Sequence, residues 1–162
     1  MRSSVKATLI ILVLQLLSCD PNGVFDRYER IPTSWHKDSI VEFKFDPPDS
    51  IDPYNLFVNL RNDNDYKFSN IYLIVELEHP QGMTIKDTLL YKMAKPNGEF
   101  LGTGLSSIKE NKLWFKEGYV FKESGSYKIN IQHAMRENGK VHGIKELEGI
   151  TDVGFRVERP DQ

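Results

Sequence analysis

The sequence predicts an all-β fold, an antiparallel β-sandwich of the immunoglobulin-like or jelly-roll-like kind. Apolar residues recur with a period of two along most of the chain, which is typical of strands with one face on a core and one face in water. Clusters of Pro, Gly, Asn and Asp separate these segments at short intervals, as turns do. No stretch longer than two helical turns has a helical period. With 162 residues, the chain is long enough for one domain with an ordinary core.

Residues 1–18 are predicted to be a cleaved lipoprotein signal peptide. Arg2 and Lys6 precede an apolar run that is too short to span a membrane. The run ends in Leu16-Leu17-Ser18-Cys19, which resembles a bacterial lipobox. The cysteine of a lipobox is acylated on sulfur and becomes the new N-terminus, so we expect Cys19 to be the site of lipid attachment. The alternative is an ordinary signal peptide in which Cys19, the only cysteine of the chain, has no role.

Residues 19–37 are predicted to be a lipid-anchored tether. The segment is polar and irregular, and Pro21, Gly23 and Pro32 interrupt it. Its few aromatic residues are expected to make only occasional contacts with the domain that follows.

Residues 38–162 are predicted to form the β-sandwich domain. Two stretches, residues 101–111 and 139–152, are expected to be extended connections between strands. Gly125-Ser126-Tyr127 resembles the tyrosine corner of immunoglobulin-like sandwiches. Alternating apolar positions predict the strands, in chain order: Val41, Phe43 and Phe45; Tyr54, Leu56, Val58 and Leu60; Ile71, Leu73, Val75 and Leu77; Leu89, Tyr91 and Met93; Leu113 and Phe115; Tyr119 and Phe121; Tyr127, Ile129 and Ile131; Val153, Phe155 and Val157.

Charge and composition argue against several classes of partner. A formal net charge of −2 argues against nucleic acid, because phosphate binding needs a surplus of basic side chains. One cysteine permits neither an intrachain disulfide nor a Cys-based zinc site. The four histidines are scattered and are expected at the surface or in turns. We therefore expect no metal, no cofactor and no small-molecule ligand.

The sequence contains no recognisable catalytic motif. It has neither a His-Glu-x-x-His metal site nor a Gly-x-Ser-x-Gly elbow, and Gly102-Thr103-Gly104 lacks the third glycine of a dinucleotide loop. Asp63-Asn64-Asp65 is acidic enough to suggest calcium, but such residues are ordinary turn formers and the EF-hand spacing is absent. No pair of carboxylates stands out among the acidic residues. We predict that the protein is not an enzyme and assign it no catalytic residues.

A charged segment late in the chain contains a candidate contact site. Leu113 and Phe115 alternate there with Trp114 and Lys116, so the two pairs fall on opposite faces of a strand. If the first pair faces the core, Trp114 points outward among charges that include Lys112. An exposed Trp ringed by Lys and Glu is suited to anchor a protein partner. The alternative is that the 101–111 connection covers it.

Three aromatic residues are further candidates for binding a carbohydrate or a protein. Trp35, Trp114 and Tyr119 would favour recognition of a carbohydrate or a protein if they were exposed. The alternative is that they are core residues.

Seven further segments, taken in order, point to a known family. They are residues 54–62, 66–70, 87–94, 98–104, 109–117, 133–136 and 149–158. Together with the lipobox at Cys19, they resemble the gliding motility lipoprotein family GldH of the Bacteroidota. No single segment is diagnostic, but the ordered set covers essentially all of the chain that follows Cys19.

The resemblance implies a small envelope lipoprotein required for gliding over surfaces. Gliding in these bacteria is tied to the type IX secretion machinery, which exports mobile adhesins. The implied role is that of a non-catalytic structural or accessory component, anchored in the membrane by a lipid on Cys19 and in contact with other envelope proteins. The alternative is a lipid-anchored module that binds glycan or peptidoglycan.

The residues after Cys19 bear on location. Lipoproteins of this phylum that reach the cell surface often have an acidic cluster directly after the cysteine. Only Asp20 is acidic here before Asp26. We therefore expect a protein that faces the periplasm, on either the inner or the outer membrane.

Overall fold

The computed structural model describes residues 22–104, 106–137 and 139–160, and in these ranges the chain forms ten strands and no helix. The predicted signal peptide and Cys19 lie outside the described residues. No long apolar helix that could cross a membrane occurs in the part of the chain that is described.

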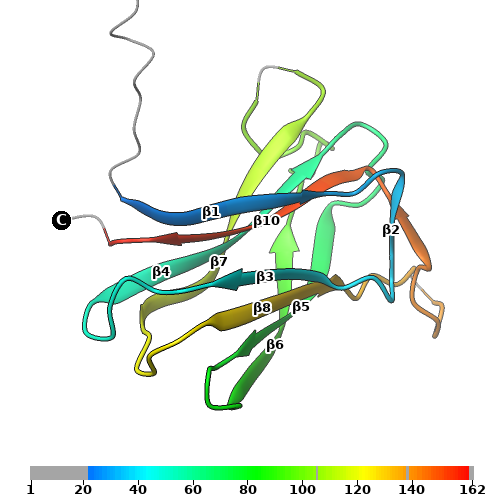
Figure 1. The fold of residues 1–162 in the computed structure, drawn as a ribbon. Helices are drawn as coiled ribbons and strands as arrows, with labels where there is room; N and C mark the ends of the chain where they lie inside the picture. The colour runs from blue at the N-terminus through cyan, green and yellow to red at the C-terminus, as the bar shows by residue number, and fades with distance from the viewer. Residues whose placement is uncertain (1–21, 105, 138, 161–162) are drawn as a thin grey trace, which may run out of the picture.

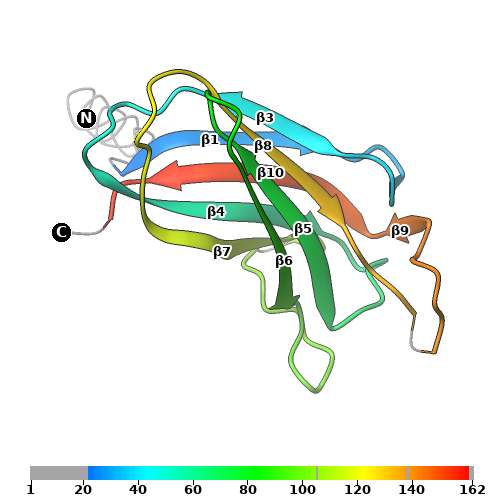
Figure 2. The same ribbon diagram turned by 90° about the horizontal axis from the view of Figure 1, so that it is seen from below.

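Two four-stranded antiparallel sheets pack face to face, as Figures 1 and 2 show from two directions. The first sheet has the order β1 (Gly23–Arg30), β10 (Ile150–Glu158), β4 (Pro53–Asn62) and β7 (Lys109–Val120). The second has the order β3 (Val41–Phe45), β8 (Tyr127–His133), β5 (Asn70–Glu78) and β6 (Thr84–Lys92). A short pair, β2 (Ser34–His36) with β9 (Glu146–Glu148), lies at one end of the sandwich.

This strand order is that of a jelly roll. The predicted all-β antiparallel sandwich is therefore confirmed, and of its two variants the jelly roll is correct. One local feature resembles the predicted tyrosine corner of immunoglobulin-like sandwiches: the Tyr127 hydroxyl accepts a hydrogen bond of 3.0 Å from the Glu123 N–H. That contact ties the start of β8 to the loop before it, much as a tyrosine corner does.

The core lies between the two sheets and follows the predicted alternation. In β8, Tyr127, Ile129 and Ile131 are fully buried between half-buried polar neighbours. Buried apolar residues also occupy every second position in β5 and β3. Phe45 and Phe155 face one another across the sandwich, with ring centroids 5.3 Å apart. The predicted strand positions thus supply most of the core.

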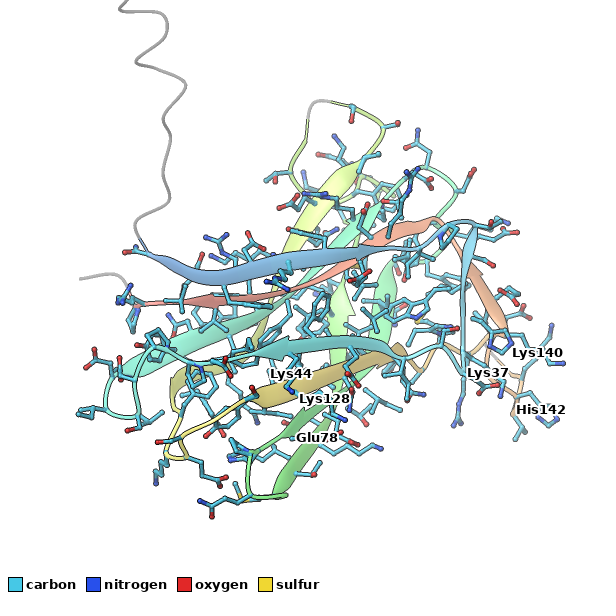
Figure 3. All side chains as sticks on the ribbon, in the orientation of Figure 1. Lys37, Lys44, Glu78, Lys128, Lys140 and His142 are labelled. Atoms are coloured by element: carbon cyan, nitrogen blue, oxygen red, sulfur yellow. The ribbon has the colours of Figure 1, made fainter. Side chains whose placement is uncertain are left out.

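We expect Ile129→Ala to lower the free energy of unfolding by about 2–5 kcal/mol, because it opens a cavity at a fully buried site. Its neighbour Lys128 faces outward and pairs with Glu78 at 2.8 Å (Figure 3). Lys128→Ala should therefore change stability by about 1 kcal/mol at most. Urea denaturation measures both values, and the reverse ranking would contradict the register of β8.

The predicted tether of residues 19–37 is corrected by the structure. Residues 23–30 form β1, an edge strand that pairs with β10, and residues 34–36 form β2. Trp35 is only 1% exposed, and its ring packs edge-on against His133 with centroids 5.3 Å apart. The folded domain therefore includes most of the segment that was expected to be irregular.

Two expected connections are also shorter than predicted. β7 is one continuous strand that begins at Lys109, inside the 101–111 segment. The 139–152 segment contains β9 and the start of β10, joined through Gly149. In both places a strand pairs with a partner that is distant in the sequence.

The first and last described residues lie at the same end of the sandwich, which we name the terminal end. The Arg159 N–H donates a hydrogen bond of 2.9 Å to the Asn22 carbonyl. The β3–β4 loop (residues 46–52) and the β7–β8 loop (residues 121–126) lie at this end (Figures 1 and 2). The β8–β9 loop (134–145) and the β2–β9 pair lie at the other, which we name the distal end.

Candidate functional site

The candidate site occupies the outward face of the first sheet. Leu113 and Phe115 of β7 point into the core, and Trp114 between them points outward and is 52% exposed. The 101–111 connection therefore does not cover Trp114. Its orientation agrees with the alternation in the sequence, and its role as a contact residue stays a prediction.

The Trp114 ring is held against the sheet by a second aromatic residue. Phe57 of β4 is the register partner of Trp114, and the two ring centroids are 4.4 Å apart. Phe57 is only 3% exposed although it does not belong to the core between the sheets. Lys112 helps to cover it, with Nζ 4.1 Å from the ring centroid and 2.5 Å from a Glu158 carboxylate oxygen. Trp114 and Lys112 thus form one packed surface.

Lys116, the third predicted contact residue, is engaged elsewhere. Its Nζ lies 2.6 Å from Asp87 Oδ2 on β6, which belongs to the second sheet. The β4–β7 register shifts between Leu56 and Phe57, so Lys116 does not continue the simple alternation from Trp114. The pair with Asp87 links the edge strands of the two sheets.

A polar cluster that sequence analysis missed lies on the same outward face. Tyr28 of β1 donates its hydroxyl hydrogen to Glu110 Oε1 at 3.0 Å and accepts from Asn59 Nδ2 at 3.0 Å. Arg61 Nε donates to Glu110 Oε2 at 2.8 Å, and the Arg61 guanidinium carbon lies 4.1 Å from the Tyr28 ring centroid. The four residues come from three strands, β1, β4 and β7. We name the outward surface made by Tyr28, Phe57, Asn59, Arg61, Glu110, Lys112 and Trp114 the Trp114 face.

A glycine makes room for this cluster. A Cβ at Gly154 of β10 would lie 2.8 Å from Tyr28 Cδ1 and 2.9 Å from the Arg27 carbonyl oxygen. The Tyr28 ring therefore crosses the β10 backbone at close range, which lets its hydroxyl reach Asn59 and Glu110. The sequence contained a signal for this contact, because a glycine within an apolar strand, such as Gly154, often marks a place where another part of the molecule approaches the backbone closely.

Electrostatics keep the Tyr28 phenol neutral near neutral pH. Partial burial, and then the hydrogen bond to the Glu110 carboxylate, raise the pKa of Tyr28 well above its usual value. The phenol therefore stays protonated and donates. Burial also raises the pKa of Asp26, which pairs with Arg156 at the edge of the cluster. Asn59 Oδ1 is buried without a hydrogen-bond partner among the described residues.

Two of the four histidines are buried. His79 lies in the β5–β6 turn, in keeping with the expectation of surface or turn positions, whereas His133 lies within β8, which corrects that expectation. His133 lies beneath Trp35, and burial lowers its pKa. His79 Nδ1 lies 3.2 Å from Glu123 Oε1, and its Nε2 lies 2.8 Å from the Tyr119 hydroxyl. Burial raises the pKa of Tyr119 to about 12, so its phenol is neutral at physiological pH. This chain of contacts fastens the β5–β6 turn to the β7–β8 loop.

The remaining candidates from the sequence are not brought together. Trp35 is in the core, Tyr119 is next to His79, and Trp114 is on the outward face, so the three aromatic residues share no surface. Asp63 and Asp65 line an acidic hollow at the distal end together with Glu146 and Glu148. Within the described ranges, no group of three or more His, Cys, Asp or Glu side chains is placed to hold a metal ion.

Comparison with known proteins gives a consistent result. The profile of a family described as GldH lipoprotein matches residues 23–157. A protein of Christiangramia forsetii named gliding motility lipoprotein GldH homolog is 56% identical over 162 residues, which are 99% of each chain. The gliding motility lipoprotein GldH of Flavobacterium johnsoniae is 50% identical over 161 residues, 99% of this chain and 100% of that protein.

Solved structures resemble this chain only distantly. A family GH115 4-O-methyl-alpha-glucuronidase matches with a TM-score of 0.44 and 12% identity, over 89% of this chain and 18% of the enzyme. The VP2 subviral particle of infectious bursal disease virus matches with a TM-score of 0.38 and 14% identity, over 87% of this chain and 34% of the viral protein. Neither likeness bears on function.

Proposed function

The chain belongs to the GldH lipoprotein family, and on that premise we propose that it is a lipid-anchored, non-catalytic component of the gliding apparatus that binds other envelope proteins through the Trp114 face. The observation that carries this proposal is the exposed Trp114 on the edge strand β7, packed on Phe57 within an ordered aromatic and charged surface. Proteins of this family are named for gliding motility, so a role in that process is the starting point.

The Trp114 face has the composition of a binding surface. Trp, Tyr and Arg are the residues that most often dominate the energy of protein interfaces. Trp114, Tyr28 and Arg61 are all fixed here by neighbours, which limits the side-chain entropy that binding would otherwise cost. The carboxylate of Glu110 and the ammonium of Lys112 add fixed charges for a complementary partner.

The lipid anchor is proposed at Cys19. The Leu16-Leu17-Ser18-Cys19 sequence has the form of a lipobox, and the thiol is the only one in the chain. More than one acyl chain is needed for firm anchoring, because a single chain holds a protein only marginally. We place the anchored protein on the periplasmic side of either membrane, where it would assist the type IX secretion machinery or the movement of its adhesins.

Gene replacement in the native organism tests this proposal. A deletion strain should stop spreading, and wild-type protein should restore spreading whereas Cys19→Ala should not. Trp114→Glu should also fail, because it replaces the exposed aromatic ring of the contact surface with a charge. The matched control is Leu90→Glu on the second sheet, since Leu90 is 54% exposed, close to the value for Trp114.

Protein amounts and adhesin secretion should be measured in every strain. Loss of spreading together with secretion would assign the protein to the shared machine, and loss of spreading alone would assign it to movement. Normal spreading with Trp114→Glu at wild-type protein level would refute the Trp114 face as the contact surface. Normal spreading in the deletion strain would refute the role in gliding altogether.

A further inference from the structure

The chain enters the folded domain almost directly after the proposed lipid. Asn22 is hydrogen-bonded to Arg159, and Gly23 pairs with Glu158 at the start of β1. Only Asp20 and Pro21 separate Asn22 from Cys19. A trans peptide advances the chain by at most ~3.6 Å per residue, so these three steps reach about 11 Å at most. The headgroup layer of a bilayer is itself about 5–7 Å thick.

We propose that the terminal end of the sandwich rests on the phospholipid headgroups, so that the distal end points away from the membrane. This inference rests on the proposed lipidation of Cys19. A chain of this length cannot hold the domain far from the bilayer, because its full extension exceeds the thickness of the headgroup layer by only about 4–6 Å. The contact is therefore a consequence of where β1 begins.

An exposed apolar side chain is present where this contact would form. Ile51, in the β3–β4 loop of the terminal end, is 81% exposed. Its position is fixed, because Asp49 Oδ1 accepts hydrogen bonds from the Ile51 N–H at 2.9 Å and the Asp52 N–H at 2.7 Å. The other oxygen of Asp49 accepts from the Tyr54 hydroxyl at 2.5 Å. A rigid turn that presents isoleucine is suited to enter the interfacial layer.

The charges of the β3–β4 loop favour a zwitterionic surface over an anionic one. The β3–β4 loop contains Asp46, Asp49 and Asp52 and has no basic residue. Arg159 lies close enough to help lower the pKa of Asp49, after the larger effect of the Tyr54 hydrogen bond. Basic clusters are what draw proteins to anionic lipids, and this loop is the opposite. The short link and Ile51 would therefore hold the domain in place.

The two ends of the sandwich supply a matched pair of probe sites. Val141 in the β8–β9 loop is 82% exposed, close to the value for Ile51, and lies at the distal end. Figure 3 labels its neighbours Lys140 and His142 far from the β3–β4 loop. Ile51 and Val141 are both apolar and β-branched, so replacement of either one by cysteine is equally mild. Acylation occupies the sulfur of Cys19, which leaves the new thiol as the one that reacts.

The test uses the full-length lipidated protein in vesicles of phosphatidylcholine and phosphatidylethanolamine. Ile51→Cys and Val141→Cys variants are labelled with the environment-sensitive fluorophore NBD, and a headgroup-nitroxide lipid is then added. We expect the label at 51 to shift to shorter wavelength and to lose intensity with the quencher, and the label at 141 to do neither. A twelve-residue Gly-Ser insertion after Pro21, which spans about 20 Å, should abolish the response at 51.

The outcomes distinguish a failure of the proposed lipid anchor from a failure of the proposed orientation. If the protein does not float with the vesicles, the lipid anchor is refuted and the inference with it. If it floats but the label at 51 is not quenched, or both labels are quenched equally, the anchor stands and the orientation is refuted. A response at 51 that persists with the Gly-Ser insertion would show that the short link does not determine the orientation.

Discussion

Trp35→Ala should lower the free energy of unfolding by about 3–5 kcal/mol, the loss typical of a large aromatic residue removed from a core. Trp35 is buried, its ring packs on His133, and its Nε1–H donates to the Ser39 carbonyl at 2.9 Å. Its removal would also expose His133, whose Nε2 lies 2.9 Å from the Trp35 carbonyl oxygen. Urea denaturation followed by far-UV circular dichroism measures the change.

Trp114→Ala is the control for this experiment. It removes the same side chain from an exposed site, where the main loss is the ring contact with Phe57. An aromatic pair contributes about 0.5–1.5 kcal/mol beyond its buried area. Equal effects of the two substitutions would mean that β2 contributes little to stability, and that residues before β3 behave as the tether which their composition suggests.

The contrast between β5 and the first two strands shows why one part of the fold was predictable and another was not. In β5 every second residue is a large aliphatic one, and all four are fully buried, so the pattern is visible locally. β1 is an edge strand whose exposed residues are mostly charged, and β2 has three residues. Both strands are defined by pairing with β10 and β9 at the far end of the chain, which no local pattern reveals.

The candidate site was also predictable only in part. Alternation places Trp114 outward because Leu113 and Phe115 on either side are apolar. The partners of Trp114 depend on register: Phe57 is placed beside it by the β4–β7 pairing, and Tyr28 reaches Asn59 only across Gly154. The shift of register between Leu56 and Phe57 accounts for the different placement of Lys116. Strand register and bulges are set by the tertiary structure, so no local pattern in the sequence reveals these contacts.

A stability loss comparable to that of Trp35→Ala is expected for Gly149→Ala, at the single residue between β9 and β10. Gly149 has φ +80°, a left-handed conformation that costs a residue with a side chain about 1–2 kcal/mol. An alanine Cβ would also lie 2.0 Å from the Tyr66 nitrogen and 2.4 Å from its Cα, which are backbone atoms that cannot rotate away. Displacing packed backbone costs a further ~1–3 kcal/mol, so we expect a loss of about 2–5 kcal/mol in total.

Gly98→Ala separates the two contributions to that loss. Gly98 has φ +87°, nearly the value at Gly149, but no atom lies within 4 Å of the position its Cβ would occupy. Its substitution should therefore cost only the conformational part, about 1–2 kcal/mol. If urea denaturation finds equal losses at the two glycines, the close approach of the 63–66 segment to Gly149 does not constrain the fold. The Gly149 carbonyl also accepts a hydrogen bond of 3.0 Å from the Asp63 N–H. A much larger loss at Gly149 would therefore show that the contact between the 63–66 segment and Gly149 determines how the β2–β9 pair joins the first sheet.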